Sequence, residues 1–262
     1  MPRSNEITFS KTGNLAVIGF NRPEKKNALN RAMTKQLCRI LEEVRDNQDL
    51  AVIILSGAGE NFISGADLAE FARFSDQPEA VEEFIGNGRK FMRGLATLPQ
   101  FTVALVNGCA LGGGLEIALA CDYIIAGPTA VFGLPEVRFG IIPGAGATQL
   151  LPARIGPGWA ARMILSGETI DAQQAAAIGL VDQLVADADF EHAGRDLSEK
   201  FNQSNRFAMG MAKQALRRSE RSADFETENR LFHACLSKDE AMNRIKGFMH
   251  NREKGRCHEH GA

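Results

Sequence analysis

The chain has 262 residues, of which 30 are basic and 32 acidic, and its formal net charge at pH 7 is −2. This length fits one large domain with a smaller appendage, and the balanced charge gives no footprint for nucleic acid and no electrostatic anchor for a membrane. We expect a cytoplasmic protein, because the first ten residues lack a secretory signal and no apolar run is long enough to span a bilayer.

The cysteines indicate a reducing compartment. Their number is odd, their spacings are wide and no CxxC occurs, so neither a disulfide framework nor a zinc site is expected. His258, Glu259 and His260 stand on a polar tail, where solvated side chains are the simpler interpretation. We predict no metal and no cofactor. The cysteines are Cys38, Cys109, Cys121, Cys235 and Cys257.

The first elements predict an α/β core. Ile7–Ser10 and Leu15–Phe20 are short apolar runs separated by a polar turn, and they predict a β-hairpin. Asn30 is a good N-cap, and apolar residues recur at helical spacing after it, which predicts a helix over residues 30–45. Ala51–Leu55 is predicted to be a buried strand. Strand, helix and strand in this order predict a crossover unit.

A long turn rich in Gly, Ser and Asn follows over residues 56–67. Asp67 at its end is interpreted as the N-cap of a short helix, with a functional role as the alternative. A helical pattern then runs from Glu79 to about Leu98. Three phenylalanines near this region are interpreted first as core residues and second as the lining of an acyl pocket. They are Phe71, Phe74 and Phe84.

The stretch over residues 101–122 is the most informative. Phe101–Val106 reads as a buried strand, and the glycines Gly112–Gly114 precede a predicted helix over Leu115–Ala120. Glycines at a helix start permit close approach to the backbone, and the first amides of a helix lack internal partners and carry a partial positive charge. An oxyanion hole requires such amides, and Glu116 lies within the first turn. A phosphate loop or tight helix–strand packing are the alternatives.

A second carboxylate follows further along. Tyr123–Ala126 and Ala130–Phe132 are predicted strands on either side of a Gly-Pro turn. Glu136 comes after a proline in a predicted loop beneath apolar residues. Such surroundings suit proton transfer near neutral pH, although an ordinary surface glutamate is the simpler reading of this residue alone.

The last hundred residues are predicted to be helical. The segments are Trp159–Leu165, Ala172–Ile178 and four further stretches between residues 189 and 251. This part contains little Gly or Pro and indicates a helical appendage or an oligomer contact. We therefore divide the chain into an α/β core over residues 1–195 and a C-terminal helical oligomerisation region over 196–262.

Several linked motifs resemble the crotonase (enoyl-CoA hydratase/isomerase) family over about residues 6 to 250. The resemblance implies a core of repeated ββα units in a spiral, a C-terminal helical trimerisation region and a homotrimer or hexamer. It also implies an acyl-CoA thioester as the ligand, with coenzyme A as part of the substrate. The motifs, in order, are NRPEKKNALN, FISGADL, NGCALGGGLEIALACD, FGLPEVRFGIIPGAGATQLLPARIG and AAAIGLVDQLV.

The resemblance also implies a site. In the family the residue after the glycine of the SGAD motif and the middle glycine of GGG supply two oxyanion-hole amides, and these are Ala66 and Gly113 here. Hydratase-like members carry one glutamate in each of the GGGxE and FGxPE turns, whereas isomerase-like members commonly keep only the second. Glu116 and Glu136 are both present. The resemblance therefore implies a hydratase or dehydratase, with Glu116 as the base for water and Glu136 as the proton donor to C2.

Contacts to the substrate follow from the same resemblance, which implies that Gly144 shapes the floor beside Glu136. Two departures concern the rest of the ligand: the family's arginine is Leu150 here, and its C-terminal F-x-E-K-R reads 248-FMHNR-252. The alternatives to a hydratase are an isomerase, another crotonase-type enzyme or a non-catalytic acyl-CoA-binding interaction protein. The implied substrate contacts are Lys25, Lys26, Ala28, Ser64, Ala66, Asp67, Leu68 and Gly113.

Overall fold

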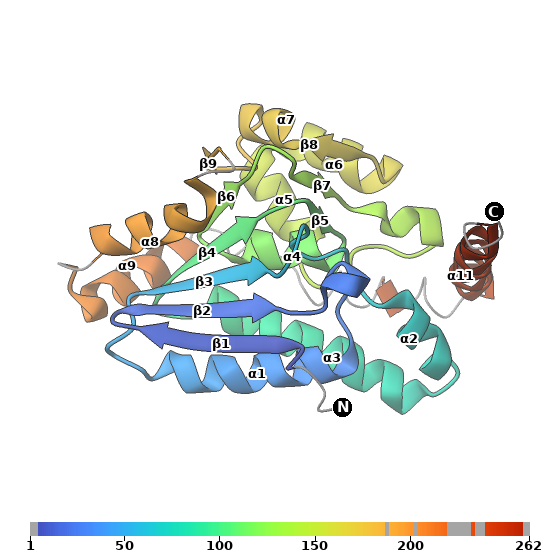
Figure 1. Cartoon of the computed structure of the whole chain (residues 1–262), viewed down its shortest axis with the longest axis horizontal. Helices are drawn as coiled ribbons and strands as arrows, with labels where there is room; N and C mark the ends of the chain where they lie inside the picture. Colours follow the sequence, from blue (N-terminus) through green and yellow to red (C-terminus); the bar gives the residue numbers. More distant parts are fainter. Residues whose placement is uncertain (1–4, 187–188, 202–203, 219–231, 234–238, 259–262) are drawn as a thin grey trace.

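A computed structural model describes residues 5–186, 189–201, 204–218, 232–233 and 239–258. Its centre is a six-stranded sheet in which only the first pair of strands is antiparallel (Figure 1). The strands in spatial order are β1 (Ile7–Thr12), β2 (Leu15–Phe20), β3 (Val52–Gly57), β4 (Phe101–Val106), β6 (Tyr123–Ala126) and β9 (Gln183–Leu184). A smaller sheet consists of β5 (Cys109–Leu111), β7 (Val131–Gly133) and β8 (Thr169–Asp171).

The two faces of the large sheet are covered by different helices. Because side chains alternate along a strand, Ile53 and Leu55 face the main core, whereas Val52 and Ile54 face the other side. The main-core face packs against α1 (Arg31–Arg45), α3 (Pro78–Ala96) and α4 (Gly113–Ala120). The opposite face packs against α8 (Phe190–Lys200). Parallel strands buried on both faces explain the uninterrupted apolar runs of the sequence.

The predicted N-terminal elements are confirmed. The hairpin forms, with β1 extending two residues beyond the predicted end to Thr12. Asn30 caps α1, since its side chain accepts a hydrogen bond of 2.8 Å from the Met33 N–H. Asp67 caps α2 (Leu68–Phe74) in the same way, accepting from the Glu70 N–H at 3.1 Å.

Several short or irregular elements were not predicted. The strands β5, β8 and β9 contain two or three residues each, which is too short for a periodic signal. Helix α5 (Ala147–Ile155) contains Pro152, a residue that removes a backbone donor and argues against a helix. The segment around Glu136 was predicted to be a loop, and this was wrong: it is a 3-10 helix, η2 (Pro135–Phe139), which the proline starts.

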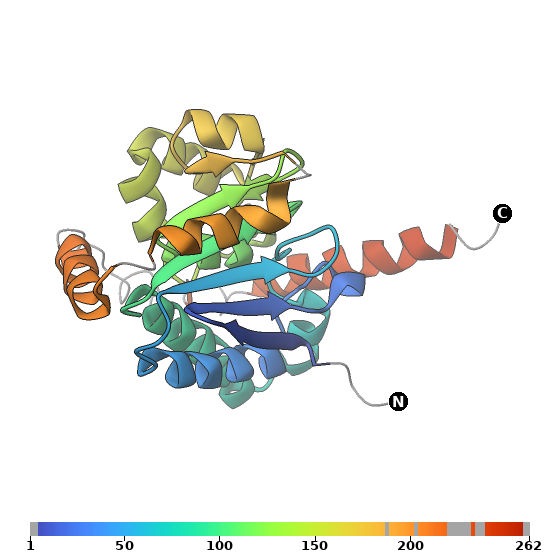
Figure 2. The same ribbon diagram turned by 60° about the vertical axis from the view of Figure 1, so that its left-hand side comes forward.

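The C-terminal third is largely helical, as predicted. It contains α6 (Pro157–Ser166), α7 (Ala172–Ala177), α8, α9 (Arg206–Arg218) and α11 (Asp239–His258), and the later part of α11 extends beyond the rest of the chain (Figure 2). Three of the four helical stretches expected after residue 189 are thus seen. Residues 202–203, 219–231 and 234–238, which include Cys235, lie outside the described residues, as do Glu259 and His260. The expected boundary after residue 195 falls inside α8.

Helix α9 is attached to the large sheet by a buried ion pair. The Lys213 ammonium lies 2.5 Å from Asp122 Oδ2 and donates to the Gln100 carbonyl at 2.6 Å. Asp122 Oδ2 also accepts from the N–H and the hydroxyl of Thr102 on β4, at 2.8 and 2.9 Å. A buried charge needs such partners. None of the helices in the described part of the chain has the length and apolar character of a membrane span.

Candidate active site

The site is built where three chain segments lie side by side. The middle one is residues 62–67, which follow β3. Ile63 donates its N–H to the Cys109 carbonyl at 2.9 Å and accepts from the Leu111 N–H at 3.0 Å. These bonds join the middle segment to β5, directly before the three glycines.

On its other side the middle segment pairs with the loop that precedes α1. The Leu29 N–H donates to the Gly65 carbonyl, and the Asp67 N–H donates to the Leu29 carbonyl, both at 2.8 Å. In a parallel bridge of this kind, the N–H of the intervening residue Ala66 points away from Leu29. Ala66 is partly exposed, and its N–H donates to no acceptor among the described residues. This predicted amide is thus available to a ligand.

The second predicted amide lies on the neighbouring segment. Gly113 is the first residue of α4, so its N–H has no partner within the helix. It is partly exposed and donates to no acceptor in the part of the chain that the structure describes. A Cβ placed on Gly112 would lie 3.9 Å from Gly65 Cα, which shows how closely the two segments approach. The structure therefore brings both predicted amides to one place.

The three consecutive glycines serve different purposes. Gly112 has φ 51° and ψ −124°, a backbone conformation that side chains strongly disfavour. A Cβ on Gly114 would lie 2.3 Å from the Ile63 carbonyl oxygen, so only glycine lets α4 approach the middle segment. A Cβ on Gly113 would meet only Leu29 Cδ1, at an ordinary 3.4 Å. The packing of the protein itself therefore explains Gly112 and Gly114 but not Gly113.

Glu136 reaches this place through the small sheet. β5 and β7 are parallel, so both strands end at the same edge, and the Gly112 N–H donates to the Gly133 carbonyl at 2.9 Å. Glu136 follows three residues later on η2. Its Oε1 lies 3.0 Å from the position that a Cβ on Gly112 would occupy. The second predicted carboxylate therefore faces the glycine turn.

Glu116 is held from a different direction. Its side chain is buried, with the residue only 3% exposed, and Oε1 accepts from the N–H groups of Ala145 and Ala147 at 2.8 and 3.2 Å. Ala147 is the first residue of α5, where the helix dipole also favours a negative charge. Two main-chain donors thus fix the Glu116 carboxylate.

The turn containing Gly144 contacts the other carboxylate. Its main chain binds Glu116 through the N–H groups of Ala145 and Ala147, and the expected place of Gly144 beside Glu136 stays a prediction. Gly144 itself lies under the ring of Phe232, since a Cβ there would come within 2.8 Å of a ring carbon. Glycine at this position leaves room for the aromatic ring.

Four of the expected coenzyme A contacts form one ridge. Lys25 and Lys26 are exposed at the end of η1 (Pro23–Lys25). The Ser64 N–H donates to the Lys26 carbonyl at 3.0 Å, and the Ala28 N–H donates to the Lys25 carbonyl at 3.1 Å. The N–H groups of Ala28 and Ser64 are therefore engaged within the protein. Their carbonyl oxygens remain as acceptors for a ligand, although that of Ala28 also accepts from Arg22 Nη1 at 2.6 Å.

The side chains of Asp67 and Leu68 make contacts within the protein. The Asp67 carboxylate caps α2 and pairs with Arg22, whose guanidinium lies 3.0 Å away, so the capping interpretation is confirmed.

Leu68 packs against a cluster of aromatic rings. The centroids of Phe71 and Phe74 are 5.3 Å apart, and Ile245 of α11 packs on this cluster. The core interpretation of these two rings is confirmed. Arg22 lies in the motif NRPEKKNALN, but no role was predicted for it.

Cys109 lies in β5 next to the site, in surroundings that disfavour a thiolate. Burial raises the pKa of its thiol, although the charge of nearby Lys26 acts in the opposite direction. The thiol therefore stays protonated near neutral pH, and a thiolate is needed for attack. Nor do the described residues include a group of three or more His, Cys, Asp or Glu side chains that could hold a metal ion.

The fold places the protein among known α/β enzymes of the crotonase type. The crystal structure of an enoyl-CoA hydratase from Bacillus anthracis matches with a TM-score of 0.79 and 34% sequence identity, covering 95% of this chain and 97% of that chain. A short-chain-enoyl-CoA hydratase of Clostridium acetobutylicum is 34% identical over 95% of this chain and 96% of its own length. A 2,3-dehydroadipyl-CoA hydratase of Escherichia coli (strain K12) is 36% identical over 95% and 97%.

A family model described as enoyl-CoA hydratase/isomerase matches residues 10–258. The chain therefore belongs to the enoyl-CoA hydratase/isomerase family. The resemblance inferred from the sequence motifs is confirmed.

Proposed function

We propose that the protein is a lyase that adds water to a 2-enoyl-CoA thioester, or removes it from a 3-hydroxyacyl-CoA. The observation that carries this proposal is the pair of N–H groups, of Ala66 and Gly113, that have no acceptor among the described residues and lie on adjoining segments. Glu136 faces the same glycine turn, and Glu116 lies in the first turn of the helix that Gly113 begins. The printed names of the relatives, which include a crotonyl-CoA hydratase of Syntrophomonas wolfei at 32% identity, support the same reaction class.

The two amides suit the charge that develops during hydration. When hydroxide adds at C3 of a thioester conjugated to a C2=C3 double bond, the carbonyl oxygen becomes an enolate-like oxyanion. The N–H groups of Ala66 and Gly113 would donate to that oxygen. Loss of one such donor typically costs about 3 kcal/mol of transition-state stabilisation. Each of the two amides is therefore worth about as much as either carboxylate.

Each of the two carboxylates performs one of the two proton transfers. Glu116, fixed by two main-chain donors, takes a proton from the water that attacks C3. Glu136, facing the glycine turn, delivers a proton to C2. Each transfer contributes about a hundredfold or more to the rate. One proton is taken up at Glu116 and one is released at Glu136, so exchange with solvent restores both groups after each turnover.

We also propose contacts for the coenzyme A part of the substrate. The exposed ammonium groups of Lys25 and Lys26 would meet the phosphates of coenzyme A, and the carbonyl oxygens of Ala28 and Ser64 would accept from the adenine amino group. Coenzyme A enters as part of the substrate, and no separate cofactor or metal takes part. We place the activity in the cytoplasm, since the described cysteines, Cys38, Cys109 and Cys121, are free thiols.

Turnover of crotonyl-CoA in the presence of EDTA tests the function. We expect loss of the conjugated enoyl absorbance and formation of 3-hydroxybutyryl-CoA, with EDTA having no effect because no step needs a metal. An isomerase would instead produce conjugated absorbance from a 3-enoyl-CoA, and an interaction protein would bind acyl-CoA without turnover. Either result would contradict the proposal. Activity lost in EDTA and restored by zinc or magnesium would contradict the metal-free mechanism.

The assembly we propose is a homotrimer, or a hexamer of two trimers. Helix α9 carries Phe207 and Met211 four residues apart on one face, and these side chains are 76% and 47% exposed in the single chain. Large exposed apolar side chains on a helix indicate a contact surface. Light scattering at micromolar concentration should give three or six times the mass of the chain. A monomer would contradict the assembly while leaving the chemistry in place.

A further inference from the structure

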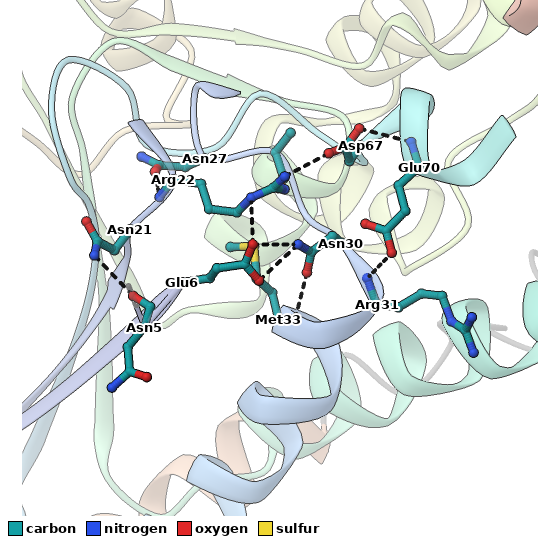
Figure 3. A network of polar contacts seen from close by, with 11 residues as sticks. Asn5, Glu6, Asn21, Arg22, Asn27, Asn30, Arg31, Met33, Asp67 and Glu70 are labelled. Atoms are coloured by element: carbon teal, nitrogen blue, oxygen red, sulfur yellow. Dashed lines mark hydrogen bonds and ion pairs between the residues drawn. The ribbon is translucent and has the colours of Figure 1, made fainter. Parts of the chain in front are cut away.

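Arg22 lies at the centre of a polar network beside the site (Figure 3). Its side chain is only 11% exposed, and the guanidinium contacts three acceptors from different parts of the chain. Nε lies 3.1 Å from Glu6 Oε1, Nη1 donates to the Ala28 carbonyl at 2.6 Å, and Nη2 donates to Asp67 Oδ2 at 3.0 Å. None of these contacts belongs to the acid–base chemistry described above.

The network around Arg22 is itself anchored. Both oxygens of Glu6 accept from the Asn30 amide at 3.0 Å, and Asn30 caps α1. The Arg22 N–H donates to the Asn27 side chain at 2.8 Å, and Asn27 in turn donates to the Asn61 carbonyl at 2.6 Å. Arg22 is therefore fixed to the start of α1 and to the loop beside β3. Its position does not depend on Asp67.

We propose that Arg22 is a positioning residue for the oxyanion hole, acting on the Ala66 amide through Asp67; this inference rests on the proposed hydratase function. Among the described residues, the two peptides that flank Ala66 bond to Leu29, and the Asp67 carbonyl accepts from the Phe71 N–H at 2.9 Å, while Gly65 has φ 106°, a conformation that glycine adopts freely. The Asp67 carboxylate adds a side-chain constraint to these main-chain bonds. Its Oδ1 is bonded to the Glu70 N–H and its Oδ2 to Arg22, which holds the residue that directly follows Ala66.

The same arginine links the segment that carries the Ala66 N–H to Ala28, one of the expected coenzyme A contacts. Because Nη1 binds the Ala28 carbonyl while Nη2 binds Asp67, one planar group sets the distance between the two segments. A lysine has a single point charge and no rigid fork, so it cannot satisfy both acceptors and Glu6 together. Misplacement by about 1 Å of a group that acts on the transition state costs about a hundredfold in rate.

Two substitutions test this role while keeping a polar side chain at each position of the network. Arg22→Lys keeps the positive charge between two carboxylates but removes the fork. Asp67→Asn keeps an N-cap for α2, since asparagine caps as well as aspartate, and removes only the charge that pairs with Arg22. The matched control is Arg45→Lys. Arg45 also makes several hydrogen bonds, to the Gly94 carbonyl at 3.1 Å and the Thr97 hydroxyl at 3.0 Å, but it joins α1 to α3 away from the site.

The expected result is a fall in kcat for crotonyl-CoA hydration of about tenfold to a hundredfold in Arg22→Lys and Asp67→Asn. KM should change much less, because the oxyanion amide acts mainly in the transition state. Arg45→Lys should keep wild-type kcat even if its melting temperature falls by a similar amount. Wild-type kcat in both site variants would overturn the proposal, and a fall in Arg22→Lys alone would overturn the route through Asp67.

A spectroscopic measurement separates positioning from general loosening of the fold. Butyryl-CoA labelled with ¹³C at the thioester carbonyl cannot be hydrated, and hydrogen bonds from the oxyanion amides lower its C=O stretching frequency on binding. We expect this shift to shrink in Arg22→Lys and Asp67→Asn but not in Arg45→Lys. An unchanged band in both site variants would overturn the proposal. Wild-type protein that shows the shift yet leaves crotonyl-CoA unchanged would instead contradict the hydratase function.

Discussion

Glu116→Gln is expected to lower kcat for crotonyl-CoA hydration by about a thousandfold, because the variant lacks the base that takes a proton from water. The protein should still fold and bind acyl-CoA. A glutamine side-chain oxygen can accept from the Ala145 and Ala147 N–H groups that hold Oε1 in the native protein, so the surrounding turn keeps its partners. Steady-state turnover and acyl-CoA binding on the same preparation measure the two effects.

Exchange of α-protons distinguishes the two carboxylates. Glu136 remains in Glu116→Gln, so slow exchange of the C2 protons of a saturated acyl-CoA in heavy water should persist and be visible by NMR. Glu136→Gln should lose both hydration and exchange, since C2 has no other proton donor or acceptor in the proposal. Equal residual hydration in the two variants, or exchange that depends on Glu116 and ignores Glu136, would reverse the assignment. Glu136 would then serve only to shape η2.

Gly113→Ala should lower kcat/KM by about a hundredfold to a thousandfold while leaving the melting temperature nearly unchanged. Within the protein the new methyl group would meet only Leu29 Cδ1, at 3.4 Å, so the fold accommodates it. The thioester would occupy the space next to the Gly113 N–H, and the methyl group would displace its oxygen from the amide. Loss of one oxyanion donor has an effect of this size.

The neighbouring glycine supplies the control. A Cβ on Gly114 would lie 2.3 Å from the Ile63 carbonyl oxygen and 2.8 Å from Ile63 Cβ, so Gly114→Ala should separate α4 from the middle segment. We expect that variant to lose thermal stability first and activity as a result. Wild-type kcat/KM in Gly113→Ala would show that no substrate atom approaches this residue. That result would remove Gly113 from the oxyanion hole.

Much of the core could be predicted because its signals are local. Long apolar runs predicted β3 and β4, and the strand–glycine–helix pattern predicted α4 with Glu116 in its first turn. The short strand β5 gave no such signal, although it is the element that brings the glycine turn beside β7 and Glu136. Its three residues, Cys109–Leu111, pair in parallel with β7, which lies more than 20 residues further along the chain. Tertiary pairing, rather than propensity, forms such an element.

The contacts that hold the site could not be predicted from local patterns. The donors to Glu116 lie 29 and 31 residues further along the chain. The Ala28 and Asp67 acceptors of Arg22 lie 6 and 45 residues after it. Arg22 stands before a proline in a polar loop, where a solvent-exposed side chain is the usual expectation. Only the pairing of distant segments shows that it is enclosed by acceptors.

The attachment of Glu116 has a consequence for how the protein can change over evolutionary time. Its carboxylate is bonded to main-chain N–H groups, which every residue except proline supplies. Ala147 is buried, but Ala145 is partly exposed, so its side chain can be replaced without removing the donor. Substitutions at position 145 can therefore change the side chain beside Glu116 while both main-chain donors to its carboxylate remain.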